Sequence, residues 1–569
     1  MRMLDGGGNT IDRFAHSESF DARGQRAGIQ YPNCVQLPFP LDGKCPTGSQ
    51  VPFSTTDAYT QGYLTQISGW ASSIGYHANG LWSSVAHTNG VTDFQYLTRK
   101  ESGGGLDNRP RPKLLKTKLG SNTLWSSGTF AYDFAGNITA QGEPDTGVGE
   151  LNHFGGVDRY LYDRVQRLRH GWLDLADPPP PGPLFSDDFE TGDTCEWNAT
   201  QPPAGCLLAG RPGGPGAGGP SSPQVVERDQ EYVFDVYGNI QSIATDGGLV
   251  NTPTDSGTNR LVSGSGTAYD SRGNLISRPG YTFVYDALDR LVRREAAGEP
   301  RKYHFLYTAD DERILTFVEE LPGSGGTNQF RWTLRDLGGT VLRDYVSVAG
   351  EAALCVQEDY VFRGSSLLGA REYSCDPDIP LPPQDFHYTL DHLGTPRLAT
   401  VGSGVVSEER KYFPFGEEAK PASPYGPRLR FTGHERDVFD LEGAQDDLDY
   451  MHARFYQALT GRFFSMDPVG GSPSAPQSWN RYAYVLGNPL KFVDPTGETA
   501  LALAIAQAIT TALGKLESAA AGVVQGSLEA SGATEVVGGS SSGQTDPAFA
   551  LGRNAAVAAA AADIYMEVS

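Results

Sequence analysis

Apolar and polar residues alternate over short stretches along most of the chain, and clusters of Gly, Asn and Asp separate these stretches. Alternation with a period of two places every second side chain on the same face of a β-strand. In the stretch YTFVYD it puts Tyr281, Phe283 and Tyr285 on one face. The pattern therefore predicts an all-β fold class, built from short, half-buried antiparallel strands and tight turns.

One unit recurs within this pattern: an aromatic residue, Asp, two further residues, Gly-Asn or a close variant, and an aliphatic residue. The copies are YDFAGNI from Tyr132, YDRVQRL from Tyr162, FDVYGNI from Phe234, YDSRGNL from Tyr269 and YDALDRL from Tyr285. Gly, Asn and Asp accept the positive φ of a hairpin turn, and the aliphatic residue starts a new strand. A single hairpin is too small to bury its aromatic face, so neighbouring units are expected to stack into a continuous sheet.

Two segments interrupt the repeats. Residues 171–225 are rich in Pro and Gly, which favours a linker, and residues 499–531 have apolar residues at helical spacing, which predicts a short Ala-rich helical tail. Within the linker an acidic group could bind calcium, but it lacks EF-hand spacing, so a solvated loop is favoured; its members are Asp187, Asp188, Glu190 and Asp193. We expect a β-repeat region, a linker, a second β-repeat region, a core and a variable tail, at 1–170, 171–225, 226–385, 386–498 and 499–569.

Charge and composition limit the classes of function that this chain can have. The net charge of -23 argues against a nucleic-acid partner, because contacts with phosphates need clustered Lys and Arg. No apolar run reaches the length of a stable membrane span. The first residues, MRMLDGGGNTIDRF, show no apolar signal segment, and we expect the recorded chain to start inside a longer protein.

The six cysteines form three local pairs, which are Cys34 with Cys45, Cys195 with Cys206, and Cys355 with Cys375. An even number of cysteines in short loops predicts disulfides formed in an oxidising compartment. No pair has CxxC spacing or nearby histidines, so we expect no metal site and no cofactor.

Residues 387–497 carry several specific motifs in order: HYTLDHLGTPRLAT, RKYFPFGEE, LRFTGHERD, LDYMHARFYQALTGRFFSMDP and WNRYAYVLGNPLKFVDPTGE. This segment resembles the RHS repeat-associated core domain, and the repeats before it extend the resemblance to RHS/YD-repeat proteins. The resemblance implies a β-sheet ribbon wound into a hollow shell, here a partial one. In bacterial polymorphic toxins and the C components of insecticidal toxin complexes, such a shell encloses a variable C-terminal polypeptide.

The resemblance also implies chemistry. Many members of the family cut their own chain after the second of two Asp-Pro-x-Gly motifs, which start here at Asp467 and Asp494. Paired carboxylates can serve as base toward water and acid toward the amide, with Arg462 as a further candidate catalytic residue. The sequence departs from the family pattern at Glu498, which replaces a leucine, in the added residues GSPSAPQS, and in Tyr456-Gln457-Ala458 before the GRF motif. Each motif could equally be only a turn. Any enzyme activity is therefore at most autoproteolytic.

Two histidines, His392 and His434, lie in motifs that favour packing over catalysis, and Tyr412, Phe413 and Phe415 predict a buried strand. The tail contains neither His nor Cys, which disfavours a metal-dependent nuclease. We expect a secreted or cell-surface shell whose partner is its own C-terminal tail, with an immunity protein or secretion machinery as further partners. The alternatives are a surface adhesion protein without toxin activity and an inactive fragment of a larger RHS protein.

Overall fold

The computed structural model describes residues 2–4, 10–34, 52–98, 111–143, 156–173, 228–246, 248–262, 266–336, 338–348, 355–375, 381–419, 428–439, 447–471, 476–498 and 501–502. These residues form antiparallel strands joined mainly by tight turns, and the prediction of an all-β fold is confirmed. Among the described residues, no helix has the length and apolar character that crossing a bilayer requires.

Three large sheets follow one another, and in each the strands pair in the order of the sequence. The first consists of β1 (Arg2–Leu4), β2 (Thr10–Phe20), β3 (Arg26–Cys34), β4 (Ser54–Thr60), β5 (Tyr63–Ile67), β6 (Ala71–Tyr76), β7 (Trp82–His87), β8 (Val91–Leu97), β9 (Pro112–Leu119) and β10 (Asn122–Thr129). The second consists of β11 (Ala131–Tyr132), β12 (Ile138–Glu143), β13 (Gly156–Tyr162), β14 (Leu168–Leu173), β15 (Arg228–Phe234), β16 (Ile240–Thr245) and β17 (Gly248–Asn251).

The third sheet is the longest. It consists of β18 (Ala268–Tyr269), β19 (Leu275–Arg278), β20 (Tyr281–Tyr285), β21 (Leu291–Ala296), β22 (Arg301–Tyr307), β23 (Arg313–Glu320), β24 (Gln329–Arg335), β25 (Val341–Val348), β26 (Cys355–Arg363), β27 (Ser366–Glu372), β28 (Gln384–Leu390), β29 (Pro396–Val401) and β30 (Val406–Glu409).

Smaller elements follow. They are the 3-10 helix η1 (Phe431–Gly433), β31 (Glu435–Asp437), β32 (Leu448–Met451), β33 (Arg454–Gln457), η2 (Ala458–Thr460), β34 (Arg462–Phe463), η3 (Pro476–Trp479), η4 (Val485–Gly487), β35 (Phe492–Val493) and β36 (Leu501–Ala502).

The aspartate of the repeat closes each turn with both of its side-chain oxygens. Asp235 Oδ1 accepts the backbone N–H groups of Tyr237 and Asn239, both at 2.9 Å, and its Oδ2 accepts Asn239 Nδ2 at 2.8 Å. In the unit from Tyr285, Arg290 Nε takes the place of the asparagine amide and donates to Asp286 Oδ2 at 2.7 Å. Either Asn or Arg can therefore stand at this position of the repeat, because either side chain can donate to the same carboxylate oxygen.

The aromatic residue joins neighbouring units. The Tyr162 hydroxyl donates to the carbonyl oxygen of Ile138 at 2.9 Å, and the Tyr307 hydroxyl donates to that of Leu291 at 2.6 Å. In both cases the acceptor is the aliphatic residue that ends the preceding turn. Each buried ring thus contributes apolar area and satisfies a backbone carbonyl of its neighbour. In β20, Phe283 is buried and the rings of Tyr281 and Tyr285 pack against the same cluster, as the alternation predicted.

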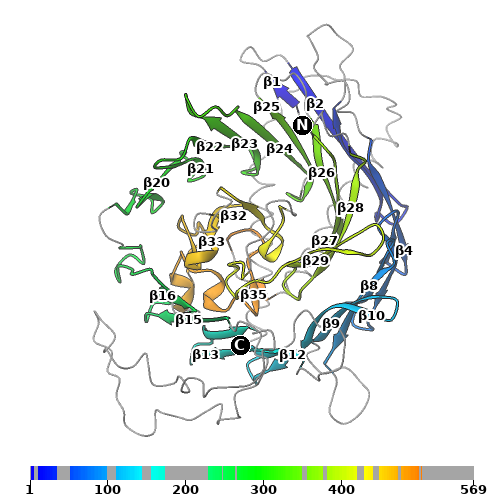
Figure 1. Cartoon of the computed structure of the whole chain (residues 1–569), viewed down its shortest axis with the longest axis horizontal. Coiled ribbons are helices and arrows are strands. Elements are labelled where there is room, and N and C mark those ends of the chain that lie inside the picture. Colours follow the sequence, from blue (N-terminus) through cyan, green and yellow to red (C-terminus); the bar gives the residue numbers. More distant parts are fainter. Residues whose placement is uncertain are drawn as a thin grey trace, which may run out of the picture.

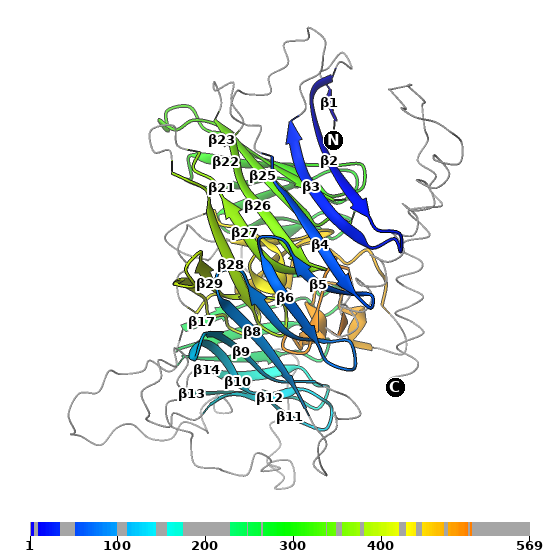
Figure 2. The same ribbon diagram turned by 90° about the vertical axis from the view of Figure 1, so that its right-hand side faces the viewer.

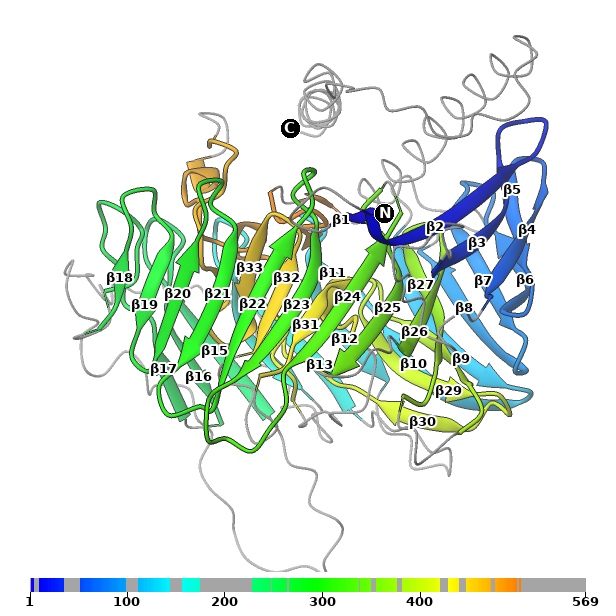
Figure 3. The same cartoon turned by 90° about the horizontal axis from the view of Figure 1, so that it is seen from above.

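The three sheets wind into a ring, shown in Figure 1, and the elements after β30 lie inside it. Figure 3 shows the strands side by side around the ring. The residues between β14 and β15 interrupt the sequence but not the sheet, because Leu173 pairs directly with Arg228. Near β26–β29 the ring overlaps its own beginning, so that the wall has two layers there (Figures 1 and 2).

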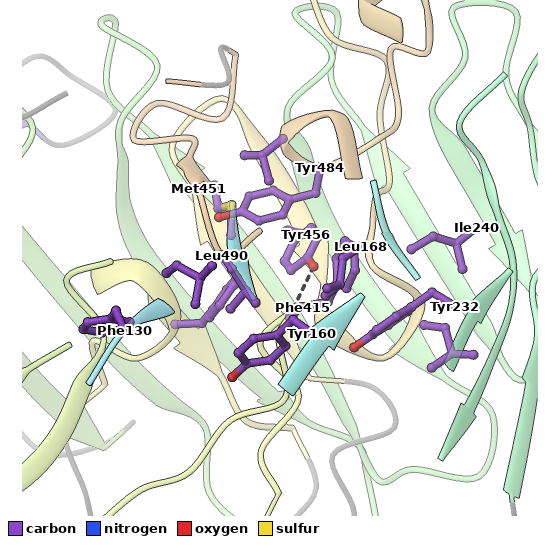
Figure 4. Packing of buried hydrophobic residues seen from close by; sticks show 14 of the residues in the cluster. Phe130, Tyr160, Leu168, Tyr232, Ile240, Phe415, Met451, Tyr456, Tyr484 and Leu490 are labelled. Carbon is purple, nitrogen blue, oxygen red and sulfur yellow. Dashed lines mark hydrogen bonds between the residues drawn. The ribbon is translucent and has the colours of Figure 1, made fainter. Parts of the chain in front are cut away.

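The elements after β30 are held in the ring by aromatic packing. Tyr456 and Tyr484 from the inside meet Tyr160, Tyr232 and other residues of the wall in one buried cluster (Figure 4). The Tyr456 hydroxyl also donates to the carbonyl oxygen of Phe415 at 2.7 Å. Aromatic side chains from segments far apart in the sequence are buried together here, and this burial joins the wall of strands to the elements inside it.

Several sequence predictions can be placed on this structure. Cys355 and Cys375 form a disulfide, whereas Cys45, Cys195 and Cys206 lie outside the described residues, so the other two pairings stay predictions. The acidic group of the linker also lies outside them.

The segment from Tyr412 to Phe415 is buried as predicted, but it is not a full strand. Tyr412 makes a single β-bridge with Glu418, and the chain then turns, with the N–H of Gly416 donating to the carbonyl oxygen of Phe413 at 2.8 Å.

The start of the tail differs from the prediction. Leu501–Ala502 form a strand that pairs with Phe492–Val493, where helical spacing predicted a helix, because the turn from Asp494 to Glu498 brings the two backbones together. The rest of the predicted helical tail lies outside the described residues.

Candidate functional site

Both Asp-Pro-x-Gly motifs form turns that resemble those of the repeats. The N–H of Val469 donates to Asp467 Oδ1 at 2.8 Å, and the N–H of Glu498 donates to Asp494 Oδ1 at 3.0 Å. Both motifs therefore form turns, as the sequence allowed. What sets these two aspartates apart is the partner of their second oxygen.

That partner is the guanidinium of Arg454, at the start of β33. Its Nη2 lies 3.0 Å from Asp467 Oδ2 and 3.3 Å from Asp494 Oδ2, so one cation bridges two aspartates that are 27 positions apart in the sequence. Arg454 and Asp494 are buried, with exposed fractions of 3% and 2%. The guanidinium also lies 3.6 Å from the centre of the Phe463 ring, which adds a cation–π contact.

The peptide bond after the second motif lies against this group. Arg454 Nε donates to the carbonyl oxygen of Gly497, while the amide of Glu498 donates to Asp494. Gly497 has φ +72°, and a Cβ atom there would lie 2.0 Å from the carbonyl oxygen of Met451. Glycine is thus required for the backbone to come this close, and both ends of the Gly497–Glu498 peptide are held by the site.

The first motif is held in place by backbone contacts. Arg454 Nη1 donates to the carbonyl oxygen of Arg481 at 3.0 Å, and Arg481 Nε donates in turn to the carbonyl oxygen of Asp467 at 2.7 Å. This relay ties the loop after β34 to the strand that carries Arg454. The added residues between the motifs do not prevent the aspartates from meeting.

Burial and crowding of negative charge shift the titration of the site. Burial raises the pKa of Asp467 to about 6, although the nearby Arg454 pulls it down. Burial, together with the charge of Asp494, also raises the pKa of Glu498 above its usual value. The pKa of Arg454 is lowered by its own burial, against the pull of both aspartates. A carboxyl that titrates near 6 can exchange a proton at neutral pH.

Arg462 does not join this group in the structure. Its Nη1 donates to Asn239 Oδ1 at 3.1 Å, its Nη2 donates to the carbonyl oxygen of Asn259, and the guanidinium faces the Tyr482 ring at 4.9 Å. These contacts attach the core to the turns of the ring. The sequence offered no signal that favoured Arg454 over Arg462, since only the pairing of β33 with its neighbours brings Arg454 to the aspartates.

Of the two histidines that the sequence assigned to packing, His434 is buried and His392 is half-buried. His392 Nε2 is bonded to the carbonyl oxygen of Leu490 at 2.9 Å, and His434 Nδ1 lies 2.9 Å from Thr432 Oγ1. Burial and the neighbouring His452 lower the pKa of His434 to about 3. In the described part of the chain, no group of three or more His, Cys, Asp or Glu residues is arranged to hold a metal ion.

The chain is similar in sequence to a bacterial nuclease and to a bacterial toxin subunit. No family model matches the chain. It is 27% identical over 278 residues to the tRNA3(Ser)-specific nuclease WapA of Bacillus spizizenii, which covers 47% of this chain and 11% of WapA. It is 32% identical over 256 residues to toxin subunit YenC2 of Yersinia entomophaga, which covers 44% of this chain and 24% of YenC2.

Solved structures share the fold. A crystal structure of TcdB2-TccC3-Cdc42 matches with a TM-score of 0.57 and 16% identity, over 90% of this chain and 22% of that chain. A wound β-ribbon that carries a compact domain inside it defines a class of shell-forming proteins. In this fold and in its sequence relatives, the chain is similar to the RHS/YD-repeat proteins of the polymorphic-toxin type. The chain spans between 11% and 24% of the length of the two relatives named above.

Proposed function

We propose that this RHS shell encloses the polypeptide after residue 498 and releases it by cutting its own chain between Gly497 and Glu498. The observation that carries the proposal is that both the carbonyl oxygen and the nitrogen of this peptide bond are hydrogen-bonded within the site. Its carbonyl oxygen accepts from Arg454, its nitrogen donates to Asp494, and Asp467 shares the same guanidinium.

The arrangement supports hydrolysis with balanced proton transfers. Asp467 takes a proton from water, whose oxygen bonds to the carbonyl carbon of Gly497. Arg454 stabilises the negative charge that develops on the carbonyl oxygen, as a preorganised donor in a buried site does. The proton that Asp467 took from water then passes to the nitrogen of Glu498 as the C–N bond breaks, while ionised Asp494 accepts the N–H of that nitrogen and pairs with Arg454. Among the three candidate catalytic residues from the sequence, Asp467 and Asp494 keep that role, and Arg454 acts where Arg462 was expected to.

The wider role follows from the relatives. WapA is named as a tRNA-specific nuclease and YenC2 as a toxin subunit, and we propose that this chain likewise belongs to a secreted or cell-surface toxin-related protein. Its partner is its own C-terminal segment, together with an immunity protein or secretion machinery. The ring of strands around the core supports a role as a container.

Self-cleavage is tested by measuring the intact mass of the purified full chain and of two variants, Asp467→Asn and Asp494→Asn. We expect the wild type to yield a fragment that begins at Glu498, and each variant to remain uncut. The matched control is Asp391→Asn. Asp391 also caps a turn, with N–H groups at 2.8 and 3.0 Å and Arg397 Nε at 2.8 Å, but it lies outside the Arg454 group.

The control separates loss of chemistry from loss of a turn. If Asp391→Asn still cuts while the other two do not, the aspartates act in the reaction. An uncut wild type in its native fold contradicts the proposal and favours the alternatives of an adhesion protein or an inactive fragment.

A further inference from the structure

The double-layered part of the wall is closed by contacts between strands about 300 residues apart in the sequence. Asn89 Nδ2, in the turn after β7, donates to Thr400 Oγ1 at 2.9 Å and to the carbonyl oxygen of Val401 at 3.1 Å, both on β29. Around it, Ile74 and Val85 of the outer layer pack in one cluster with Leu368 of the inner layer. We call this contact between β6–β9 and β26–β29 the seam; Figures 1 and 2 show the two layers.

Two histidines meet inside the seam. His87 Nδ1 of the outer layer lies 3.3 Å from His387 Nδ1 of the inner layer, and their side chains are buried, with exposed fractions of 3% and 4%. His87 Nε2 lies 2.9 Å from Asp93 Oδ2. An ionised Asp93 requires His87 Nε2 to donate, so His87 Nδ1 is the acceptor and His387 Nδ1 the donor.

Both carboxylate oxygens of Asp93 already accept hydrogen bonds from other groups. Its Oδ1 already accepts the hydroxyls of Thr117 at 2.7 Å and Thr389 at 3.0 Å. Its charge also acts on the half-buried Arg363 of the inner layer.

The other groups that face His387 do not supply a free negative charge. Asp385, on the same strand, is held by two bonds to Arg371, at 2.6 and 2.8 Å. The Trp70 ring covers His387, with the ring centres 5.1 Å apart. A cation at His387 would therefore be buried against Trp70 and His87, while the nearby carboxylates of Asp93 and Asp385 are already bonded to other groups.

We propose that the His87–His387 contact is an acid-sensitive latch, and that uptake of a proton by these rings separates the two layers of the wall. A proton on His87 would set its Nδ1–H against the Nδ1–H of His387, and a proton on His387 would bury a positive charge whose nearest carboxylates are already bonded to other groups. Opening the seam hydrates the rings and removes both costs. The latch is independent of self-cleavage, because its residues lie outside the aspartate site.

The direction of the effect follows from linkage. In the closed seam, burial and the neighbouring His87 lower the pKa of His387 to about 3. A histidine released into water titrates near 6.5, so the open form binds more protons below that pH and closure weakens as the pH falls. Between neutral pH and about pH 5, the ratio of open to closed seam should rise about 25-fold for this one histidine.

Hydrogen exchange on the intact chain tests the latch at two pH values, after correction for the intrinsic rate of amide exchange. We expect the protection factors of β7–β8 and β28–β29 to fall about 25-fold between neutral pH and about pH 5. Strands β15–β16 lie outside the seam and should keep their protection. Equal protection of the seam at both pH values would overturn the proposal.

A variant identifies the group responsible. His387→Gln keeps a polar side chain but cannot titrate, so its seam should show the same protection at both pH values. The matched control is His304→Gln. His304 lies on β22, outside the seam, and its Nε2 is 2.9 Å from Glu319 Oε2. A seam that still opens in acid in both His387→Gln and His87→Gln would also overturn the proposal. If His387→Gln loosens the seam at every pH, the protection of the wild-type seam at the two pH values still decides.

Discussion

At the scale of single residues, the site depends on one arginine that meets two carboxylates and one carbonyl group. Asp467, Asp494 and Gly497 each contact the guanidinium of Arg454, and the buried setting makes each contact stronger than it would be in water. Glu498 adds a third carboxyl nearby, and its pKa is raised by burial and by Asp494. The family's usual leucine would add no charge at this position.

The pKa of Asp467 sets an expectation for the rate of cleavage. A base with a pKa of about 6 must be ionised to act, so the rate should fall about tenfold for each pH unit below 6 and level off above it. The measurement is the rate at which the fragment appears after refolding by dilution into buffers of different pH. A rate that does not change between acidic and neutral buffers, in chain that has refolded, would assign the base to another group.

At the scale of elements, the repeat turn explains both the constant and the variable positions of the sequence. Its fifth residue has positive φ in every unit that starts with an aromatic and Asp, with Gly238 at +84°, Gln166 at +66° and Asp289 at +63°. Glycine reaches this conformation without steric cost, whereas other residues are strained by about 1 kcal/mol. The units without glycine therefore rely on their hydrogen bonds and packing to hold the same shape.

Position 166 offers a clean test, because the side chain of Gln166 is exposed and its backbone carbonyl keeps the bond from Asn488 whatever the side chain. We expect Gln166→Gly to be more stable than Gln166→Ala by about 1 kcal/mol, since only alanine is strained at this φ. Urea unfolding of the two variants provides the comparison. Equal stabilities would mean that the turn relaxes to another conformation.

At the scale of the whole molecule, the ring and its contents are joined by buried charge as well as by aromatic rings. Glu435 on β31 of the core accepts from Arg313 of the ring at 2.9 Å, and also from Arg335 of the ring and Arg428 of the core. Its exposed fraction is 3%. Such a cluster adds little net stability while it is complete but is costly when one partner is lost.

We therefore expect Glu435→Gln to lower the free energy of unfolding by about 3 to 5 kcal/mol, because it leaves buried guanidinium groups without their shared carboxylate. The control is Glu319→Gln, in which a partly exposed pair with His304 is broken and less than about 1 kcal/mol should be lost. Thermal unfolding of both variants checks the contrast. Similar losses would show that the core is held by its aromatic contacts alone.

The sequence by itself determined the class of fold and the local structure, because both depend on short-range rules. Alternation with a period of two predicts strands, and Asp followed by Gly-Asn or Asp-Arg predicts the turns between them, whatever lies further along the chain. The two Asp-Pro-x-Gly motifs could be found in the same way. Their chemistry could be expected only from resemblance to a family, since either motif alone is also a good turn.

Only the tertiary structure decided which side chains meet. Arg454 reaches Asp467 and Asp494 through the pairing of short core strands, while Arg462, closer to Asp467 in sequence, faces the ring instead. His87 and His387 meet because the wound ribbon overlaps its own beginning. Such contacts are set by how many strands make one turn of the wall, and no local pattern of residues contains that number.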